Sequence, residues 1–247
     1  MKEGYTHIAV VLDSSGSMAT IFNDTVAGFN HFLKAQKEAE GEATMTLVEF
    51  AQPTFERGAV PTPWGPNTLI GGVLNDQIPK VSPSINVKFD FRPVTAVEEL
   101  TKKNYTPHGN TPLLDTIGET ILRTGKALQA LPESLRPSKV LFVIITDGEE
   151  NASHFYNLDK VKELTSHQQI VYKWEFMYLG ANQDAIQVGG SLGIKASSSM
   201  SYGLSSGEIG STYQVLASKT ASYRAVNATA DALNFTEEER TSAKKSS

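Results

Sequence analysis

A short apolar run near the start of the chain limits the folds that this sequence can adopt more than any other feature. The five consecutive apolar residues from Ile8 to Leu12 are followed at once by Asp13, Ser14, Ser15, Gly16 and Ser17. An extended run that is apolar on both faces is typical of a strand in the middle of a parallel sheet covered by helices. Open sheets of this kind bind ligands beyond the carboxyl ends of their strands. The run therefore predicts an α/β fold with a site at Asp13, Ser15 and Ser17.

These three polar side chains have two interpretations. Their oxygen atoms are hard donors, of the kind that Mg²⁺, Ca²⁺ and Mn²⁺ prefer. The alternative is structural: Ser15 or Ser17 would cap a helix, and Asp13 would be a turn residue. On this stretch alone both interpretations stay open, because short motifs also arise by chance.

A second apolar run, from Val140 to Ile145, also leads into an aspartate, in the sequence Thr146-Asp147-Gly148. The chain alternates such runs with helical patterns, which predicts a doubly wound, mostly parallel central sheet with helices on both faces. The alternation of apolar and polar residues from Ile85 to Phe91 predicts one antiparallel edge strand in this sheet.

The two aspartates are expected to face each other, because the first and fourth strands of such a sheet are neighbours at its switch point. Two ionised carboxylates this close repel each other, so a proton, a lysine or a divalent cation must neutralise them. Neither loop contains a lysine or an arginine, which favours the cation. Thr111 would add a hydroxyl at the same rim, and Thr111 and Pro112 are expected as the N-cap and first residue of a helix.

Together these residues resemble the metal-ion-dependent adhesion site of von Willebrand factor type A (vWA) domains, in the same chain order. The matching residues are Asp13, Ser15, Ser17, Thr111 and Asp147. The stretches from Trp174 to Asp184 and from Asn151 to Ser153 resemble single-domain vWA proteins of bacteria and their phages. The resemblance covers nearly all of the chain from Tyr5 to Asn227.

The resemblance implies a vWA or Rossmann-like fold and a bound Mg²⁺, with Mn²⁺ or Ca²⁺ as alternatives. It implies that Ser15, Ser17 and often Thr111 ligate the cation directly. Asp13 and Asp147 would act largely through water, and one position would stay open for a carboxylate of a partner protein.

The composition bounds the organisation of the chain. Its 247 residues, 40% of them hydrophobic, predict a single domain over residues 1–235. Six of the eleven prolines fall between Gln52 and Ser84, which predicts an inserted loop there, and such an insert is a departure from the vWA pattern. We expect residues 236–247 to form a mobile tail.

The cysteine content and the net charge of the chain indicate its cellular location and the classes of partner that it can bind. The chain has no cysteine, a net charge of −5 and no basic stripe, so we expect a cytoplasmic protein without nucleic-acid partners. No apolar stretch approaches the length of a membrane span, and we expect no contact with a membrane.

The favoured function is a Mg²⁺-dependent protein-binding module that captures a Glu or Asp side chain of a partner protein, and not an enzyme. One alternative is a metal-dependent phosphoesterase or phosphotransferase that uses the same carboxylates. A phosphatase of the haloacid dehalogenase type needs a second aspartate where this chain has Ser15, and no Gly-x-Ser-x-Gly sequence surrounds the serines. Another alternative is a phage structural or assembly protein whose insert makes the contacts.

Overall fold

The sheet of this protein has six strands in the order β3-β2-β1-β4-β5-β6. The computed structural model describes residues 1–51 and 85–244, so the expected proline-rich insert lies outside the described residues. All neighbouring strands are parallel except β3, which runs antiparallel to β2 at one edge. This arrangement confirms the predicted fold class. The strands are β1 (Lys2–Asp13), β2 (Glu42–Phe50), β3 (Ile85–Pro93), β4 (Pro137–Thr146), β5 (Glu175–Ala181) and β6 (Ser199–Tyr202).

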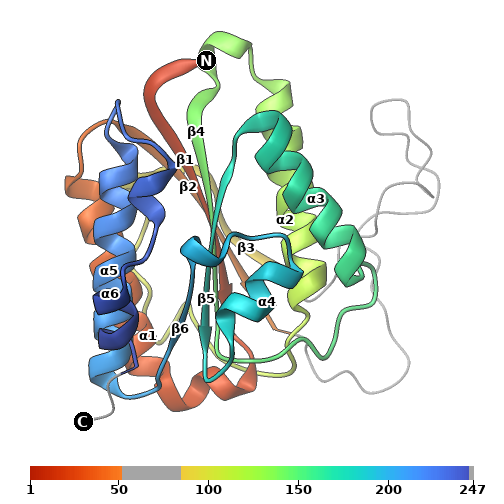
Figure 1. Ribbon diagram of the computed structural model, residues 1–247, viewed down its shortest axis with the longest axis vertical. Helices are drawn as coiled ribbons and strands as arrows, with labels where there is room; N and C mark the ends of the chain where they lie inside the picture. The colour runs from red at the N-terminus through yellow and green to blue at the C-terminus, as the bar shows by residue number, and fades with distance from the viewer. Residues whose placement is uncertain (52–84, 245–247) are drawn as a thin grey trace.

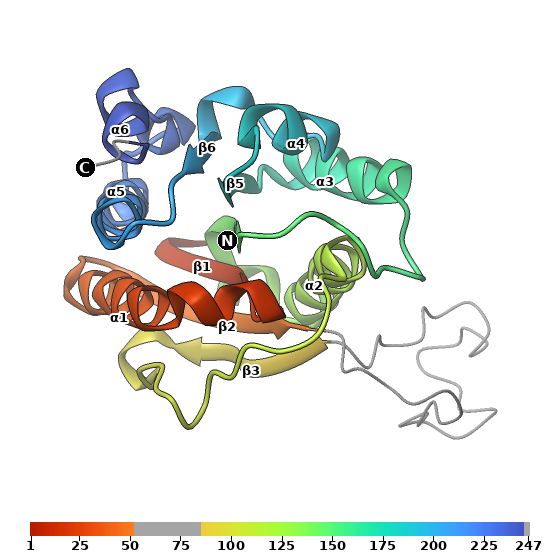
Figure 2. The same ribbon diagram turned by 90° about the horizontal axis from the view of Figure 1, so that it is seen from below.

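Helices cover both faces of the sheet. Figures 1 and 2 show α1, α5 and α6 on one side of the sheet and α2, α3 and α4 on the other. The helices are α1 (Phe22–Glu38), α2 (Leu113–Ala130), α3 (Leu158–Tyr172), α4 (Ala185–Ser191), α5 (Ser206–Arg224) and α6 (Glu237–Ser242). None of the helices in the described ranges combines the length and the apolar character needed to cross a bilayer.

Strand β1 lies in the centre of the sheet because its side chains are apolar in both directions. Ile8, Val10 and Leu12 face the core formed with α1 and α5, whereas Ala9 and Val11 face the core formed with α2 and α3. All five side chains are fully buried. Burial of each of the larger ones contributes about 1.5–3 kcal/mol, so the strand that carries Asp13 is held firmly on both faces.

The start of α2 differs from the prediction. Thr111 is not its N-cap: the helix begins at Leu113, and the preceding residue makes no capping hydrogen bond through its side chain. The loop that follows β4 supplies the acceptors instead, since a Glu150 carboxylate oxygen accepts from the Leu114 amide at 2.8 Å and the Ser153 hydroxyl oxygen accepts from the Asp115 amide at 2.9 Å. The hydroxyl of Thr111 is therefore not used to cap the helix.

The segment from residue 236, which we expected to be a mobile tail, contains the helix α6 in its described part. The side chain of Thr236 caps α6 in a reciprocal pair with Glu239, and Ala243 is fully buried. The guanidinium of Arg240 donates to the carbonyl oxygen of Ala196 at 2.8 Å and to that of Ser199. The segment is rich in charge, but its arginine docks it against the strand β6 region, while residues 245–247 lie outside the described part.

Candidate metal centre

Three loops meet at the carboxyl ends of β1 and β4, the end of the molecule seen in Figure 2. The two strands are direct neighbours, with Leu12 paired to Ile145, so Asp13 and Asp147 follow adjacent strands as expected. The Ser17 hydroxyl donates to Oδ1 of Asp147 at 2.6 Å, and the hydroxyl oxygens of Ser15 and Ser17 are 3.1 Å apart. The loop after β1 thus reaches the loop after β4 through its serines.

The carboxylate of Asp13 is completely buried and accepts two short hydrogen bonds. The Ser15 amide donates to Oδ1 at 2.7 Å, and the hydroxyl of Thr146 donates to Oδ2 at 2.6 Å. Burial raises the pKa of Asp13 from 3.8 to about 6, although both hydrogen bonds oppose the rise and the charge of Asp147 adds to it. Burial also raises the pKa of Asp147, against the hydrogen bond from Ser17. In the absence of a cation, the site therefore disfavours the negative charge that both side chains carry in water.

Gly148 brings the third loop into the same place. A Cβ atom on this glycine would lie 2.9 Å from Oγ1 of Thr111 and 3.6 Å from Oδ2 of Asp13. The Thr111 hydroxyl therefore occupies the place that a side chain at Gly148 would need, and the Asp13 carboxylate lies within van der Waals contact of the same place. Asn151 holds Thr111 there, since its Oδ1 accepts from the Thr111 amide at 2.9 Å.

The structure thus brings together all five residues that the sequence singled out: Asp13, Ser15, Ser17, Thr111 and Asp147. Ser14, the remaining serine of the motif, is directed elsewhere, because its hydroxyl donates to the carbonyl oxygen of Phe50 at 3.0 Å. The set consists of two carboxylates and three hydroxyls. These are oxygen donors that suit Mg²⁺ and similar hard cations.

A divalent cation also fits the charge of the site. Among the ion pairs of the described residues, none involves Asp13 or Asp147. Over the same described ranges, no three His, Cys, Asp or Glu side chains cluster in a way that could hold a metal. The candidate site contains only two carboxylates, so it does not form such a cluster. It depends on neutral hydroxyls for its remaining donors.

Sequence reasoning missed three residues at this site. Thr146 carries the hydroxyl that bonds Asp13, and its only signal was its place between a buried strand and Asp147. Tyr105 donates its hydroxyl hydrogen to the main-chain oxygen of Asp13 at 2.6 Å. Gln183 donates from Nε2 to the Gly148 carbonyl oxygen at 3.5 Å. The last two come from distant parts of the chain, and no local pattern marks them.

The comparisons with known proteins rest on structure alone: no protein-family model matches the sequence, and neither does any curated protein. Proximal thread matrix protein 1 from the mussel byssus overlaps with a TM-score of 0.55 and 11% identity, over 88% of this chain and 48% of that one. A second structure of that protein, with a zinc-occupied MIDAS motif, gives a TM-score of 0.54 at 12% identity, over 88% and 48% of the two chains.

The open form of the pilus adhesin SpaC from Lactobacillus rhamnosus GG overlaps with a TM-score of 0.54 and 13% identity, over 90% of this chain and 30% of that one. The chain thus spans less than half the length of these solved structures. Identities this low speak only for the fold. With its central, mostly parallel sheet and its single antiparallel edge strand, the chain shares the fold of these solved structures, and this is the vWA-like α/β arrangement that the sequence resemblance implies.

Proposed function

We propose that this chain is a protein-binding module that holds Mg²⁺, with Mn²⁺ or Ca²⁺ as alternatives, and uses it to capture a Glu or Asp side chain of a partner protein. The observation that carries the proposal is the convergence of the two carboxylates and three hydroxyls defined above at the carboxyl edge of the sheet. Within residues 1–51 and 85–244, no basic side chain forms an ion pair with either carboxylate.

The five residues would divide the work according to their hydrogen bonds. The hydroxyls of Ser15, Ser17 and Thr111 would ligate the cation directly. Both oxygens of Asp13 already accept a hydrogen bond, which supports a role through water and through its charge, and we assign the same role to Asp147. When bound, the cation would supply the positive charge that attracts a partner's carboxylate.

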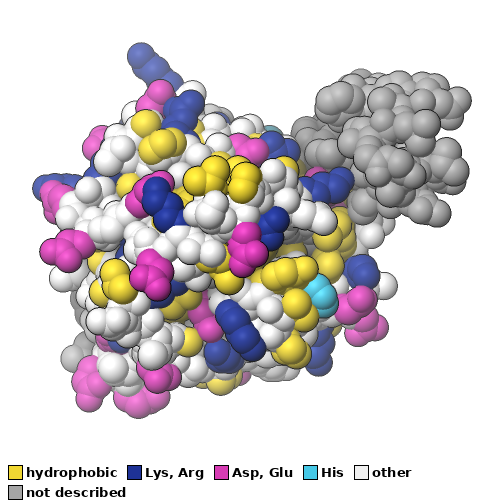
Figure 3. Space-filling model, turned by 90° about the horizontal axis from the view of Figure 1, so that it is seen from above, with side chains coloured by type: hydrophobic (Ala, Val, Ile, Leu, Met, Phe, Trp, Pro, Cys, Tyr) yellow, Lys and Arg dark blue, Asp and Glu magenta, His cyan; other side chains and the backbone are white. Residues whose placement is uncertain are grey.

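A binding role agrees with the names of the structural neighbours, one a matrix protein of mussel threads and the other a pilus adhesin. The MIDAS motif of one of them is occupied by zinc. For this chain we propose Mg²⁺ instead, with Mn²⁺ or Ca²⁺ as alternatives. The cytoplasmic location, and the absence of membrane and nucleic-acid partners, stay predictions. Figure 3 views the end opposite the candidate site, where acidic, basic and apolar side chains are interspersed and form no basic stripe.

The experiment that tests the proposal compares pull-downs from native lysate in Mg²⁺ and in chelator. We expect partner capture in Mg²⁺ with wild type, and loss of capture both in chelator and with Thr111→Ala. Capture that is equal under all three conditions would contradict the proposal. A parallel screen with phosphoester substrates tests the enzymatic alternative, and Mg²⁺-dependent hydrolysis that is lost in Asp13→Asn would replace the binding module by a phosphoesterase.

A further inference from the structure

We propose that Lys88 and Tyr105 are positioning residues for the candidate metal centre, and that they set its affinity for the cation by fixing the main chain at Asp13. The inference rests on the proposed metal-binding function. It concerns residues that lie outside the donor set and that are not among the residues matched to the vWA metal site.

Tyr105 fixes the main chain at Asp13 through a side-chain hydrogen bond. Its side chain is fully buried, and its hydroxyl donates to the Asp13 carbonyl oxygen at 2.6 Å. Burial raises the pKa of Tyr105 well above its ordinary value, and the charges of Asp13 and Glu49 add to the effect. At neutral pH the phenol is protonated and acts as the hydrogen-bond donor.

The same loop makes two further bonds to the metal-site loop. The His108 amide donates to the Ser14 carbonyl oxygen at 2.8 Å, and the Gly16 amide donates to the Gly109 carbonyl oxygen at 3.0 Å. Residues 105–109 thus run along the backbone that carries the first aspartate and both serines of the donor set. A shift of this loop would displace several donors at once.

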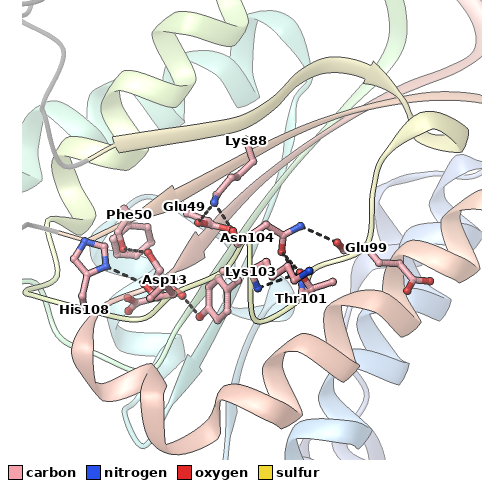
Figure 4. A network of polar contacts seen from close by, with 12 residues as sticks. Asp13, Glu49, Phe50, Lys88, Glu99, Thr101, Lys103, Asn104 and His108 are labelled. Carbon is pink, nitrogen blue, oxygen red and sulfur yellow. Dashed lines mark hydrogen bonds and ion pairs between the residues drawn. The ribbon is translucent and has the colours of Figure 1, made fainter.

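Lys88 ties this loop to the sheet. Its ammonium donates to the carbonyl oxygen of Asn104, the residue before Tyr105, and lies 3.1 Å from Oε2 of Glu49 on β2. Figure 4 shows Lys88 reaching down from β3 to Glu49 and Asn104, with Asp13 lower in the view. Asn104 also closes its own turn, because Oδ1 accepts from the Thr101 amide at 2.6 Å. Hydrogen bonds from the main-chain oxygen and the side chain of Asn104 therefore fix the turn that precedes Tyr105.

The ion pair of Glu49 and Lys88 is largely buried, and the burial of two charges has a desolvation cost. The side chains are only 4% and 22% exposed, and the second carboxylate oxygen, Oε1, has no hydrogen-bond partner among the described residues. Burial raises the pKa of Glu49 to about 7, although Lys88 opposes the rise. Well-packed apolar residues are often at least as stable as a buried ion pair. What an apolar pair could not supply is a directed donor for the Asn104 carbonyl, and hence the anchor of Tyr105.

The test measures Mn²⁺ affinity by electron paramagnetic resonance and thermal stability in chelator. Tyr105→Phe keeps the ring and removes the hydroxyl. The double variant Glu49→Gln with Lys88→Met removes both buried charges, so that neither is left unpaired, and removes the anchor of Asn104. We expect each to weaken Mn²⁺ binding about 10- to 100-fold, the usual effect of losing a group that orients metal ligands.

The matched control is Arg123→Met. Arg123 lies in α2 and pairs with Asp90, two residues along β3 from Lys88, at 2.7 Å. Both of its side-chain hydrogen bonds to described residues go to this carboxylate and none to the site loop. We expect this variant to bind Mn²⁺ as wild type does. A purely structural role for Lys88 and Tyr105 would lower the melting temperature in chelator and leave the Mn²⁺ affinity unchanged.

Wild-type affinity in both Tyr105→Phe and the double variant would therefore overturn the inference while leaving the proposed function intact. The absence of Mn²⁺ binding by wild type would overturn both.

Discussion

The substitution Gly148→Ala tests the shape of the candidate metal centre by placing one methyl group inside it. The added Cβ would lie 2.9 Å from Oγ1 and 3.5 Å from Cγ2 of Thr111, and 3.6 Å from Oδ2 of Asp13. Gly148 is not among the glycines with positive φ, so alanine brings no backbone strain at this position. Any effect must come from the space that the methyl group occupies.

The expected size of the effect follows from these distances. Thr111 is buried and β-branched, so its side chain has little freedom to turn away. Overpacking of this kind costs about 1–3 kcal/mol, which lowers the melting temperature in chelator. A cation present at tenfold its dissociation constant stabilises the folded protein by about 1.4 kcal/mol, or roughly 3–6 °C for a chain of this length. We expect wild type to show this Mg²⁺ shift and Gly148→Ala to lose it.

The assay is a thermal melt of both proteins in chelator and in Mg²⁺. Gly125→Ala is the matched control, because a Cβ at Gly125 in α2 would meet no atom within 4 Å. This control should keep the full Mg²⁺ shift and melt slightly higher, since alanine favours a helix over glycine. A full Mg²⁺ shift in Gly148→Ala would refute the reasoning, because it would place the cation away from the space between Thr111 and Asp13.

Three further predictions follow from other parts of the structure. Thr111→Ala should weaken partner binding at least tenfold in a direct affinity measurement while Thr111→Ser retains it, and equal affinities would remove this hydroxyl from the site. Burial lowers the pKa of His7 from 6.5 to about 3, so the folded state excludes a proton that the unfolded chain binds, and stability should fall as the pH drops below 6.5, by about 3 kcal/mol at pH 4. His7→Gln should flatten this acid limb in denaturant titrations, and an unchanged limb would mean that other groups cause it. Arg240→Ala should speed amide hydrogen exchange in residues 237–244, whereas unchanged exchange would show that α6 docks without its arginine.

The sequence was sufficient to predict the central strands and to single out five polar residues that the structure brings close together. An apolar run that ends in a polar cluster, as at Leu12 and Asp13, signals both burial and position within a parallel sheet. Asp147 follows the same rule on the neighbouring strand, and the structure confirms that the strands are adjacent. These features are local, so a pattern of a few residues is enough to mark them.

The supports of the site could not be predicted in this way. Tyr105 bonds a residue 92 positions away in the chain, and the partners of Lys88 come from two different segments. The capping of α2 was misassigned for the same reason, because its acceptors lie in the loop after β4. Such contacts depend on the packing of the whole domain and leave no periodic or compositional trace.

The most direct test of the account is a Mn²⁺ titration of the purified protein, followed by isothermal calorimetry or by the loss of the free-ion resonance. The central claim is that Asp13, Asp147 and the three hydroxyls of the donor set form one cation site. It predicts one saturable Mn²⁺ per chain, displaced by Mg²⁺ and lost in Asp147→Asn. The absence of saturable binding at millimolar Mn²⁺, or binding that survives this substitution unchanged, would contradict it.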